Sequence, residues 1–367
     1  MAKLELYAQV EVSFPDNQYS INICRNGLTD PGMLKHLVPG KQVLIVTNQT
    51  IAPHYMHHLQ NAYADLQCDA VILPDGEEYK NQYSLHTIYD ALIQKRHHRD
   101  TTLIALGGGV VGDITGFAAS TFQRGARYIQ IPTTLLAQVD ASVGGKTAIN
   151  HPLGKNLIGS FYQPQAVLID LNTLNTLPER EFRAGLAEII KYGLLTGGDF
   201  LSQLRDELRQ GINAQSAQLP NLIAQCCSIK AQYVISDEKE HGARALLNLG
   251  HTFAHALEAY THYKRWLHGE AVAIGLFCAA VLSGIIGLLD TSVINDIEQM
   301  LSDAGLPHKI PADINLNELR DLMSLDKKIK NNCLRFVVIR TPGDCYLDSK
   351  VTEDCLFQAL NKAVEGE

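Results

Sequence analysis

No Cys-x-x-Cys pair and no cysteine–histidine spacing of a zinc ribbon occurs in the sequence, although it holds eight cysteines. In a chain of 367 residues, this scatter also argues against a disulfide framework. The first residues include Glu5 and Glu11 and lack the apolar core of a signal peptide. We therefore expect a protein of the reducing cytoplasm.

Runs of basic residues are also absent. The chain has 31 Lys and Arg against 39 Asp and Glu, which gives 31 − 39 = −8 at pH 7. This balance argues against nucleic acid or an anionic membrane as the main partner. Because 46% of the residues are hydrophobic and only 19% are charged, we expect an ordinary globular chain. Individually placed cations must then hold any anionic ligand.

One uncharged stretch, residues 271–289, is long enough to span a membrane. It stands alone, is rich in alanine and glycine, and has no basic cluster beside it. These features favour a helix that is buried on all sides within a helical domain, so we expect no membrane association.

Two patterns divide the chain. In the first half, short apolar runs alternate with helix-compatible stretches, which predicts a parallel sheet covered on both faces. These runs are 43–46, 70–73, 102–106, 128–131 and 166–170. After Pro178 helical periodicity takes over, at 179–195, 200–209, 219–235, 251–259 and 270–289, with a late apolar run at 334–339 that is compatible with a strand.

The predicted fold is therefore an α/β N-terminal domain with a parallel, Rossmann-like sheet, residues 1–176, and a mostly α-helical C-terminal domain, residues 177–367. In folds of this type, ligands bind at strand ends and between domains. We therefore expect the active site in the cleft between the two domains.

Residues 103–113, LIALGGGVVGD, combine a strand, a glycine-rich turn and a helix start. Gly107, Gly109 and Gly112 match the dinucleotide-binding fingerprint, in which amides at a helix N-terminus hold a pyrophosphate. Two features differ from the usual fingerprint. The loop follows the third predicted strand, and no acidic residue lies about 20 residues further on, where a ribose contact is expected. The loop alone leaves phosphate binding and a tight packing turn equally open.

Glycine-bounded lysines follow this loop. Gly145, Lys146 and Thr147 resemble the end of a P-loop, but Asp140 stands where that motif needs its first glycine, so we reject a P-loop. Lys146, and Lys155 in HPLGKN, lie instead in an apolar, glycine-rich stretch. Such point charges suit a phosphate or carboxylate group, whereas the alternative is that they are solvated loop lysines.

A carboxylate and an ammonium group occur together in AEIIKYG. Glu188 and Lys191 are three residues apart and share one face of a predicted helix with apolar neighbours. They form either an intrahelical ion pair or a metal ligand beside a substrate contact. Their spacing alone does not separate these alternatives.

Three histidines, His251, His255 and His268, follow within 18 residues, and Glu270 adds a carboxylate. Imidazole and carboxylate groups are the usual ligands of a catalytic divalent metal. No His-Glu-x-x-His motif is present, so a zincin is excluded. The histidines either bind a metal or are structural, and His268 before Gly269 is also compatible with a helix end. The spacing leaves open which two histidines are ligands.

Six segments together resemble the bacterial 3-dehydroquinate synthases, members of the sugar phosphate cyclase family, and their order covers both predicted domains. The segments are PDGEEYKN (74–81), LGGGVVGDITGFAASTFQRG (106–125), IPTTLLAQVDASVGGKTAINHPLGKNLIGSFYQP (131–164), AEIIKYG (187–193), LNLGHTFAHALE (247–258) and WLHGEAVAIG (266–275). The resemblance implies a lyase that converts 3-deoxy-D-arabino-heptulosonate 7-phosphate into 3-dehydroquinate and phosphate in the shikimate pathway. It also implies NAD and a divalent metal, usually zinc, with cobalt as the alternative.

The same resemblance implies residue roles. The metal ligands are Glu188, His251 and His268. The NAD contacts are Asp75, Gly76, Glu77, Glu78, Tyr79, Lys80, Gly109, Val110, Val111, Gly112, Asp113, Thr133, Thr134, Lys146, Lys155, Thr173, Leu174, Asn175 and Thr176. The substrate contacts are Asp140, Lys146, Asn156, Lys191, Lys230, Arg244, Asn248 and His255, and either Lys327 or Lys328 completes the grip on the phosphate.

Arg124 matches a residue that reaches the phosphate site of the neighbouring subunit, which implies a homodimer. The implied reaction is redox-neutral: NAD takes a hydride from C5, phosphate leaves, the hydride returns and an intramolecular aldol step closes the ring. Cys24, Ala254 and Asn332 stand where the family commonly has glycine, and none of them is an implied contact.

Three other functions stay as alternatives. Another sugar phosphate cyclase would share the metal and NAD sites. A metal-dependent glycerol or glycerol-1-phosphate dehydrogenase would share the sheet, but the pattern at 131–164 fits it poorly. A non-catalytic NAD-binding module would need no metal set, and the presence of Glu188, Lys191, His251 and His268 argues against it.

Overall fold

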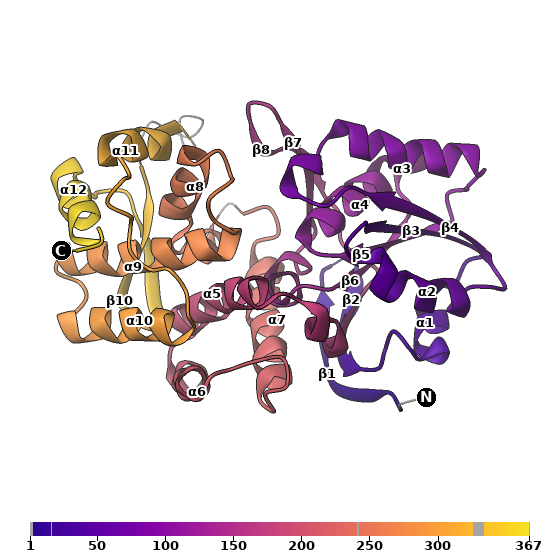
Figure 1. Cartoon of the computed structure of the whole chain (residues 1–367), viewed down its shortest axis with the longest axis horizontal. Coiled ribbons are helices and arrows are strands. Elements are labelled where there is room, and N and C mark those ends of the chain that lie inside the picture. The colour runs from indigo at the N-terminus through magenta and orange to yellow at the C-terminus, as the bar shows by residue number, and fades with distance from the viewer. Residues whose placement is uncertain (1–2, 16, 241, 326–333, 367) are drawn as a thin grey trace. The chain divides into compact units, whose positions relative to one another are not determined.

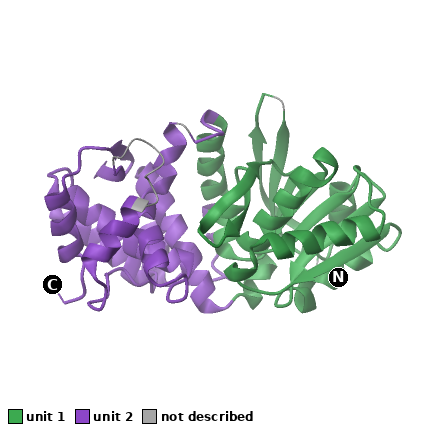
Figure 2. Cartoon of the chain, turned by 90° about the horizontal axis from the view of Figure 1, so that it is seen from above, with its two compact units in different colours: residues 1–177, 223–235 green, residues 178–222, 236–367 purple. Residues whose placement is uncertain are grey.

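The computed structural model describes residues 3–15, 17–240, 242–325 and 334–366. The chain forms two compact units (Figure 2): Met1–Leu177 with Ile223–Ile235, and Pro178–Leu222 with Ser236–Glu367. The sequence predicts a single division near residue 176. The structure also assigns 223–235, most of one long helix, to the first unit, where Lys230 forms an ion pair with Asp140.

The first unit is built on a seven-stranded sheet with the strand order β1-β2-β9-β6-β5-β3-β4 (Figure 1). The strands are β1 Glu5–Ser13, β2 Gln18–Arg25, β3 Gln42–Asn48, β4 Gln67–Leu73, β5 Thr102–Gly107, β6 Arg127–Pro132 and β9 Ala166–Asp170. All neighbouring pairs are parallel except β1 and β2. The five predicted strands are all present, so the predicted parallel sheet is confirmed.

Successive strand residues point to opposite sides of the sheet. Because these residues are continuously apolar, both faces of the sheet are covered by helices. Val43 and Ile45 of β3 join one apolar cluster with α1 (Pro31–Leu37) and α2 (Ala52–Ala62). Leu44 and Val46 join the other cluster, with α3 (Gln82–Gln94) and α4 (Gly109–Thr121). This burial on both faces explains why the strand sequences are continuously apolar.

Short irregular elements complete the first unit. The hairpin of β7 (Lys146–His151) and β8 (Gly154–Phe161) stands out from the main sheet (Figure 1). The short helical turns are η1 Glu77–Tyr79, η2 Phe122–Arg124, η3 Ala137–Ala141 and η4 Leu171–Thr176. Three of these turns, η1, η3 and η4, come soon after strands β4, β6 and β9, so they extend the carboxyl edge of the sheet.

The second unit is mostly helical, as predicted. Its elements are α5 Glu179–Thr196, α6 Gly198–Gln210, η5 Ala243–Asn248, α8 His251–Tyr260, α9 His268–Ile285, α10 Thr291–Asp303, α11 Leu316–Leu325, β10 Phe336–Thr341, β11 Asp344–Asp348 and α12 Glu353–Lys362, while α7 Leu219–Ser236 lies mainly in the first unit. Helices α5, α8, α10 and α12 and the hairpin of β10 and β11 pack around α9.

Among the described residues, α9 is the one helix that is long and apolar enough to cross a membrane. Its 18-residue window has a mean hydropathy of 1.6, but 78% of the window is buried inside the protein. The predicted core helix is therefore confirmed. The predicted end at residue 289 is wrong, because the helix stops at Ile285 and Gly287 adopts a left-handed backbone with φ of 76°.

Candidate active site

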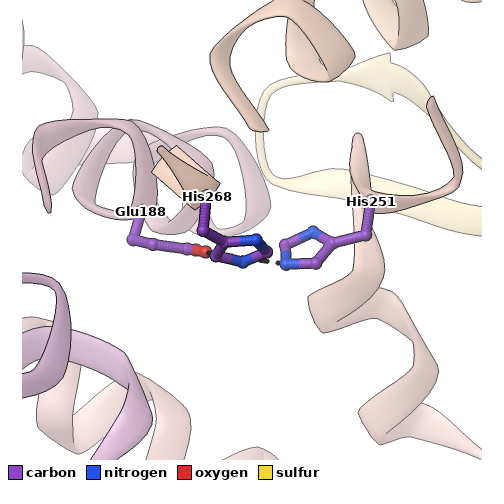
Figure 3. A group of neighbouring side chains, drawn as sticks. All are labelled: Glu188, His251 and His268. Carbon is purple, nitrogen blue, oxygen red and sulfur yellow. Dashed lines mark ion pairs between the residues drawn. The ribbon is translucent and has the colours of Figure 1, made fainter. Parts of the chain in front are cut away.

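Three ligand-type side chains meet in the second unit although they lie far apart in the sequence. Glu188 lies in the middle of α5, His251 is the first residue of α8, and His268 is the first residue of α9. Their candidate ligand atoms all lie within 4.8 Å of one another, and the side chains converge (Figure 3). The Glu188 side chain is fully buried and that of His268 is 35% exposed, so the cluster is closed on one side and accessible on another.

Acceptors behind the two histidines determine which ring nitrogen faces Glu188. Nδ1 of His251 lies 3.1 Å from the Leu249 carbonyl oxygen, and Nδ1 of His268 lies 3.4 Å from Oε1 of Glu258. With the protons on Nδ1, the Nε2 atoms keep their lone pairs, and they lie 3.5 Å and 3.7 Å from Oε1 of Glu188. Acceptors of this kind orient imidazoles for metal binding.

The electrostatic environment also suits a metal. Burial lowers the pKa of His251 and outweighs the opposing effect of Glu188. The neutral imidazole is the form that binds metals. A carboxylate and two imidazoles with one accessible side match a catalytic zinc site, which has three protein ligands and an open position. The residues present therefore fit a divalent metal.

Other predicted residues surround this cluster in the second unit. Nζ of Lys191 lies 2.6 Å from Oε2 of Glu188, so the ion pair and the metal ligand use different oxygens and are compatible. The ring of His255 lies 5.6 Å from that of His251 and 6.2 Å from that of His268, outside the group of three. His268 begins a helix, so the alternative that it ends one is wrong.

The turn η5, just before α8, carries two predicted substrate contacts. Arg244 is almost fully buried, and its Nη1 donates to the Glu238 carbonyl oxygen at 2.5 Å. Nδ2 of Asn248 donates to Oε1 of Glu240 at 2.7 Å. These bonds tie both side chains to the segment that precedes η5.

In the first unit, most of the predicted NAD contacts follow the carboxyl ends of parallel strands, whereas Lys146 and Lys155 lie in the β7–β8 hairpin. Residues 75–80 follow β4, 109–113 follow β5, 133 and 134 follow β6, and 173–176 follow β9. The chain passes from β3 outward to β4 and then returns to β5 on the other side of β3. Ligands of open α/β sheets bind at such a reversal, at the carboxyl ends of the strands. The glycine loop follows β5 and therefore lies at this reversal of the strand order, although β5 is not the first strand of the sheet.

The glycine loop joins β5 directly to α4. Within the described part of the chain, no side chain caps the N-terminus of α4, and the first intrahelical bond runs from the Gly112 amide to the Gly108 carbonyl. A Cβ atom at Gly112 would lie 2.9 Å from Oε1 of Gln130, and one at Gly107 would lie 2.8 Å from Val111. The glycines thus serve close packing and also leave a helix N-terminus suited to phosphate.

The segment after β4 is tied to its neighbours by polar contacts. Asp75 accepts hydrogen bonds from Asn48 at 2.7 Å and from Thr50 at 2.6 Å. Sequence reasoning missed these two residues, although Asn48 stands at the carboxyl end of a predicted strand. Lys80 is buried, pairs with Asp113 and donates to Asn156 at 2.6 Å.

Burial alone would lower the pKa of Lys80, but the nearby Asp113 and Glu77 carboxylates raise it. Lys80 therefore ties the segment after β4 to α4 and to the β7–β8 hairpin. Glu77, another predicted NAD contact, also faces this hairpin: its Oε1 lies 4.0 Å from Nζ of Lys155.

Asp140 and Lys230 also come together in the first unit. Nζ of Lys230 lies 3.0 Å from Oδ2 of Asp140 and donates to its carbonyl oxygen at 2.7 Å. In η4, Thr173 accepts from Gln138 at 3.0 Å, and Thr176 bonds to the Tyr55 hydroxyl at 2.5 Å.

Two predicted phosphate contacts, Lys146 and Arg124, are exposed residues. Lys146 begins β7, and Arg124 lies in η2 with φ of 66°, directly after Gln123 with φ of 47°. Two consecutive left-handed residues other than glycine are uncommon and mark functional sites more often than average. Lys327 and Lys328 lie outside the described residues.

Comparisons with known proteins show which family the chain resembles along its length. Residues 70–184 match the family described as 3-dehydroquinate synthase N-terminal, and residues 185–329 match 3-dehydroquinate synthase C-terminal. A 3-dehydroquinate synthase of Legionella pneumophila is 68% identical over 367 residues, which is 100% of both chains. One of Coxiella burnetii is 51% identical over 94% of this chain and 96% of its own.

A solved structure with the same fold is ValA, a 2-epi-5-epi-valiolone synthase from Streptomyces hygroscopicus, with NAD+ and Zn2+ bound. It is 26% identical, with a TM-score of 0.86 over 96% of this chain and 98% of its own. The family matches span both units, and the Legionella relative matches the chain along its whole length. The chain therefore belongs to the 3-dehydroquinate synthase family.

Proposed function

We propose that the chain is the lyase that converts 3-deoxy-D-arabino-heptulosonate 7-phosphate into 3-dehydroquinate and phosphate, acting as a homodimer in the cytoplasm. The observation that carries the proposal is the cluster of Glu188, His251 and His268, open on one side, in a chain that is 68% identical to a 3-dehydroquinate synthase over its full length. A metal-free dinucleotide-binding module would have no use for this donor set.

We assign Glu188, His251 and His268 as the ligands of a divalent metal, zinc or cobalt. The donor set and the acceptors behind both imidazoles support this assignment. When bound, the metal would polarise the C4 and C5 oxygens of the substrate, and NAD would exchange a hydride with C5. In this assignment His255 contacts substrate, because it lies beside the cluster and outside it.

For NAD, we assign the carboxyl edge of the sheet in the first unit. The N-terminus of α4 would hold the pyrophosphate through backbone amides of 109–113. Asp75 is an acceptor suited to ribose hydroxyls, because Asn48 and Thr50 already hold its carboxylate in place. Thr133, Thr134 and the turn 173–176 would complete the edge.

For the substrate, we assign cations and amides of both units. In the first unit these are Lys146, Asn156 and Lys230, with Asp140 paired to Lys230. In the second unit they are Lys191, Arg244, Asn248 and His255. Cations that are placed one by one suit an anionic phosphate and carboxylate in a chain whose net charge is −8. Their common role is to orient one reactive intermediate and exclude water from it.

The test is incubation of the purified protein with the heptulosonate phosphate, NAD and zinc, following phosphate release, product identity and NADH. We expect one phosphate for each 3-dehydroquinate and no stoichiometric NADH, because the hydride returns to the substrate. Accumulation of NADH would instead identify a polyol dehydrogenase. A different carbocycle from another sugar phosphate would identify a related cyclase.

A further inference from the structure

The first turn of α9 meets α5 at three consecutive residues. Residues spaced by four lie along one face of a helix, and three such residues of α5 contact the start of α9 in order. The three pairs are Arg180–Glu270, Ala184–Gly269 and Glu188–His268. The last pair consists of two of the three assigned metal ligands. The other two pairs determine where α9 lies along α5.

The ion pair between Arg180 and Glu270 is bidentate. Nε of Arg180 donates to Oε1 of Glu270 and Nη2 donates to Oε2, both at 2.7 Å. Oε2 of Glu270 also accepts from the backbone N–H of Leu267 at 2.8 Å, so the same carboxylate caps α9 directly before His268. An arginine fork on a carboxylate fixes direction as well as distance.

Glycine allows the second contact. A Cβ atom at Gly269 would lie 1.9 Å from the Ala184 carbonyl oxygen, so a larger residue would push α9 away from α5. Further along α9, a Cβ atom at Gly275 would lie 2.1 Å from the carbonyl oxygen of Gly250, the residue before His251. Through two glycines, α9 thus touches the backbone one turn before Glu188 and directly before His251.

We propose that Arg180 and Glu270 are positioning residues of the metal site, which with Gly269 fix the register of α9 on α5 so that His268 and Glu188 converge. This inference rests on the metal site assigned above and adds residues that hold its geometry without binding the metal. Loss of outer partners of metal ligands typically weakens metal binding about 10–100-fold. We expect a loss of that size here.

The first experiment measures zinc affinity of the metal-free, full-length protein by competition with a chromophoric chelator. The variant is Glu270→Gln and the matched control is Glu179→Gln. Glu179 also pairs with an arginine of α5, Arg183, but its side chain is 76% exposed and it does not cap α9. We expect about 10–100-fold weaker zinc binding for Glu270→Gln and unchanged binding for the control. Arg180→Lys should fall between them, because lysine keeps the charge and loses the fork.

The second experiment separates geometry from general destabilisation. The visible absorption of bound Co2+ reports the arrangement of its ligands, so Glu270→Gln should change the spectrum and Glu179→Gln should not. Gly269→Ala should also lose zinc affinity. Its control is Gly284→Ala on the same helix, where the new Cβ would meet the end of the Ile294 side chain at 2.5 Å, far along α9 from the ligands. If Gly269→Ala does not fold, the Glu270 comparison decides.

The outcomes distinguish this inference from the proposal beneath it. If the unaltered protein binds no zinc, the metal site itself is wrong and the inference falls with it. If the unaltered protein binds zinc and Glu270→Gln shows the same affinity and the same Co2+ spectrum, the metal site stands and the positioning role is overturned.

Discussion

Nζ of Lys191 lies 2.6 Å from Oε2 of Glu188, and both side chains are buried. Glu188 therefore faces two histidines with one oxygen and a lysine with the other. A buried carboxylate needs such a partner, because an uncompensated charge in the interior is costly. The pair also holds an ammonium group beside the assigned metal, where it can contact an anionic substrate.

Replacing Lys191 with methionine should separate these two roles. In the metal-free protein, the loss of one partner of a buried pair should lower the free energy of unfolding by about 3–5 kcal/mol. Zinc should still bind, because all three assigned ligands stay, whereas turnover should be lost with the substrate contact. Urea unfolding, zinc content and phosphate release measure these effects.

The control for that variant is Arg183→Met. Arg183 pairs with Glu179 one turn away on the same helix, but both side chains are exposed. An exposed pair contributes only about 0–1 kcal/mol, so stability and turnover should change little. If Lys191→Met is no less stable than this control, Lys191 does not compensate Glu188.

Removing the metal should abolish activity. The metal content of purified variants should show which residues are its ligands. Glu188→Gln and His268→Ala should lose the metal, whereas His255→Ala should keep it and lose turnover. The reason is that His255 does not belong to the group of Glu188, His251 and His268, whose ligand atoms all lie within 4.8 Å of one another. Metal analysis of the purified variants checks this, and a metal-free His255→Ala beside a loaded His268→Ala would show the assignment to be wrong.

The choice between His255 and His268 shows where sequence reasoning ends. His251 and His255 are one turn apart on one helix, so spacing makes them an attractive pair. His268 belongs to another helix, and it reaches the site because Gly269 lets α9 approach α5. No periodicity encodes that approach. The resemblance to the family names His268, whereas the residues alone leave the choice open.

The central strands of the sheet are easier to predict from the sequence than its edge strand β1. The strands β3, β5, β6 and β9 are buried on both faces, which requires continuous apolar runs that are visible in the sequence. Strand β1, at the edge, is mostly exposed and mixes polar with apolar residues, so no run marks it. Lys80 is a similar case: the resemblance to the family implies an NAD contact, and its burial against Asp113 appears only in three dimensions.

A buried histidine at the other edge of the sheet should make stability depend on pH. His97 is 3% exposed, with Nε2 at 3.1 Å from Asp69 and Nδ1 at 3.1 Å from Thr101. Burial lowers its pKa despite Asp69, and His98 adds to this effect, while Lys95 lies 3.9 Å from the same carboxylate. Protonation therefore favours the unfolded chain.

Because the unfolded chain binds this proton at a higher pH than the folded protein, stability should fall as the pH drops below about 6.5. Urea unfolding of the unaltered protein and of His97→Gln at pH 8 and at pH 5.5 tests this. The variant should lose less stability between the two pH values, since it has no proton to take up there. An equal loss in both proteins would mean that His97 does not contribute.

The last prediction concerns Arg124 and Lys146, which we expect to act on one phosphate from opposite subunits of a homodimer. Removing either charged contact should cost about 2–5 kcal/mol of binding if the phosphate stays desolvated, so Arg124→Ala and Lys146→Ala should each be nearly inactive. In a mixed dimer of the two variants, one site would carry both defects and the other would be intact. Activity should then return to about half of the normal value per mixed dimer, since Arg124 of one subunit completes the site of the other. Phosphate release after verified subunit exchange measures the recovery. Its absence would place both residues in the site of a single subunit.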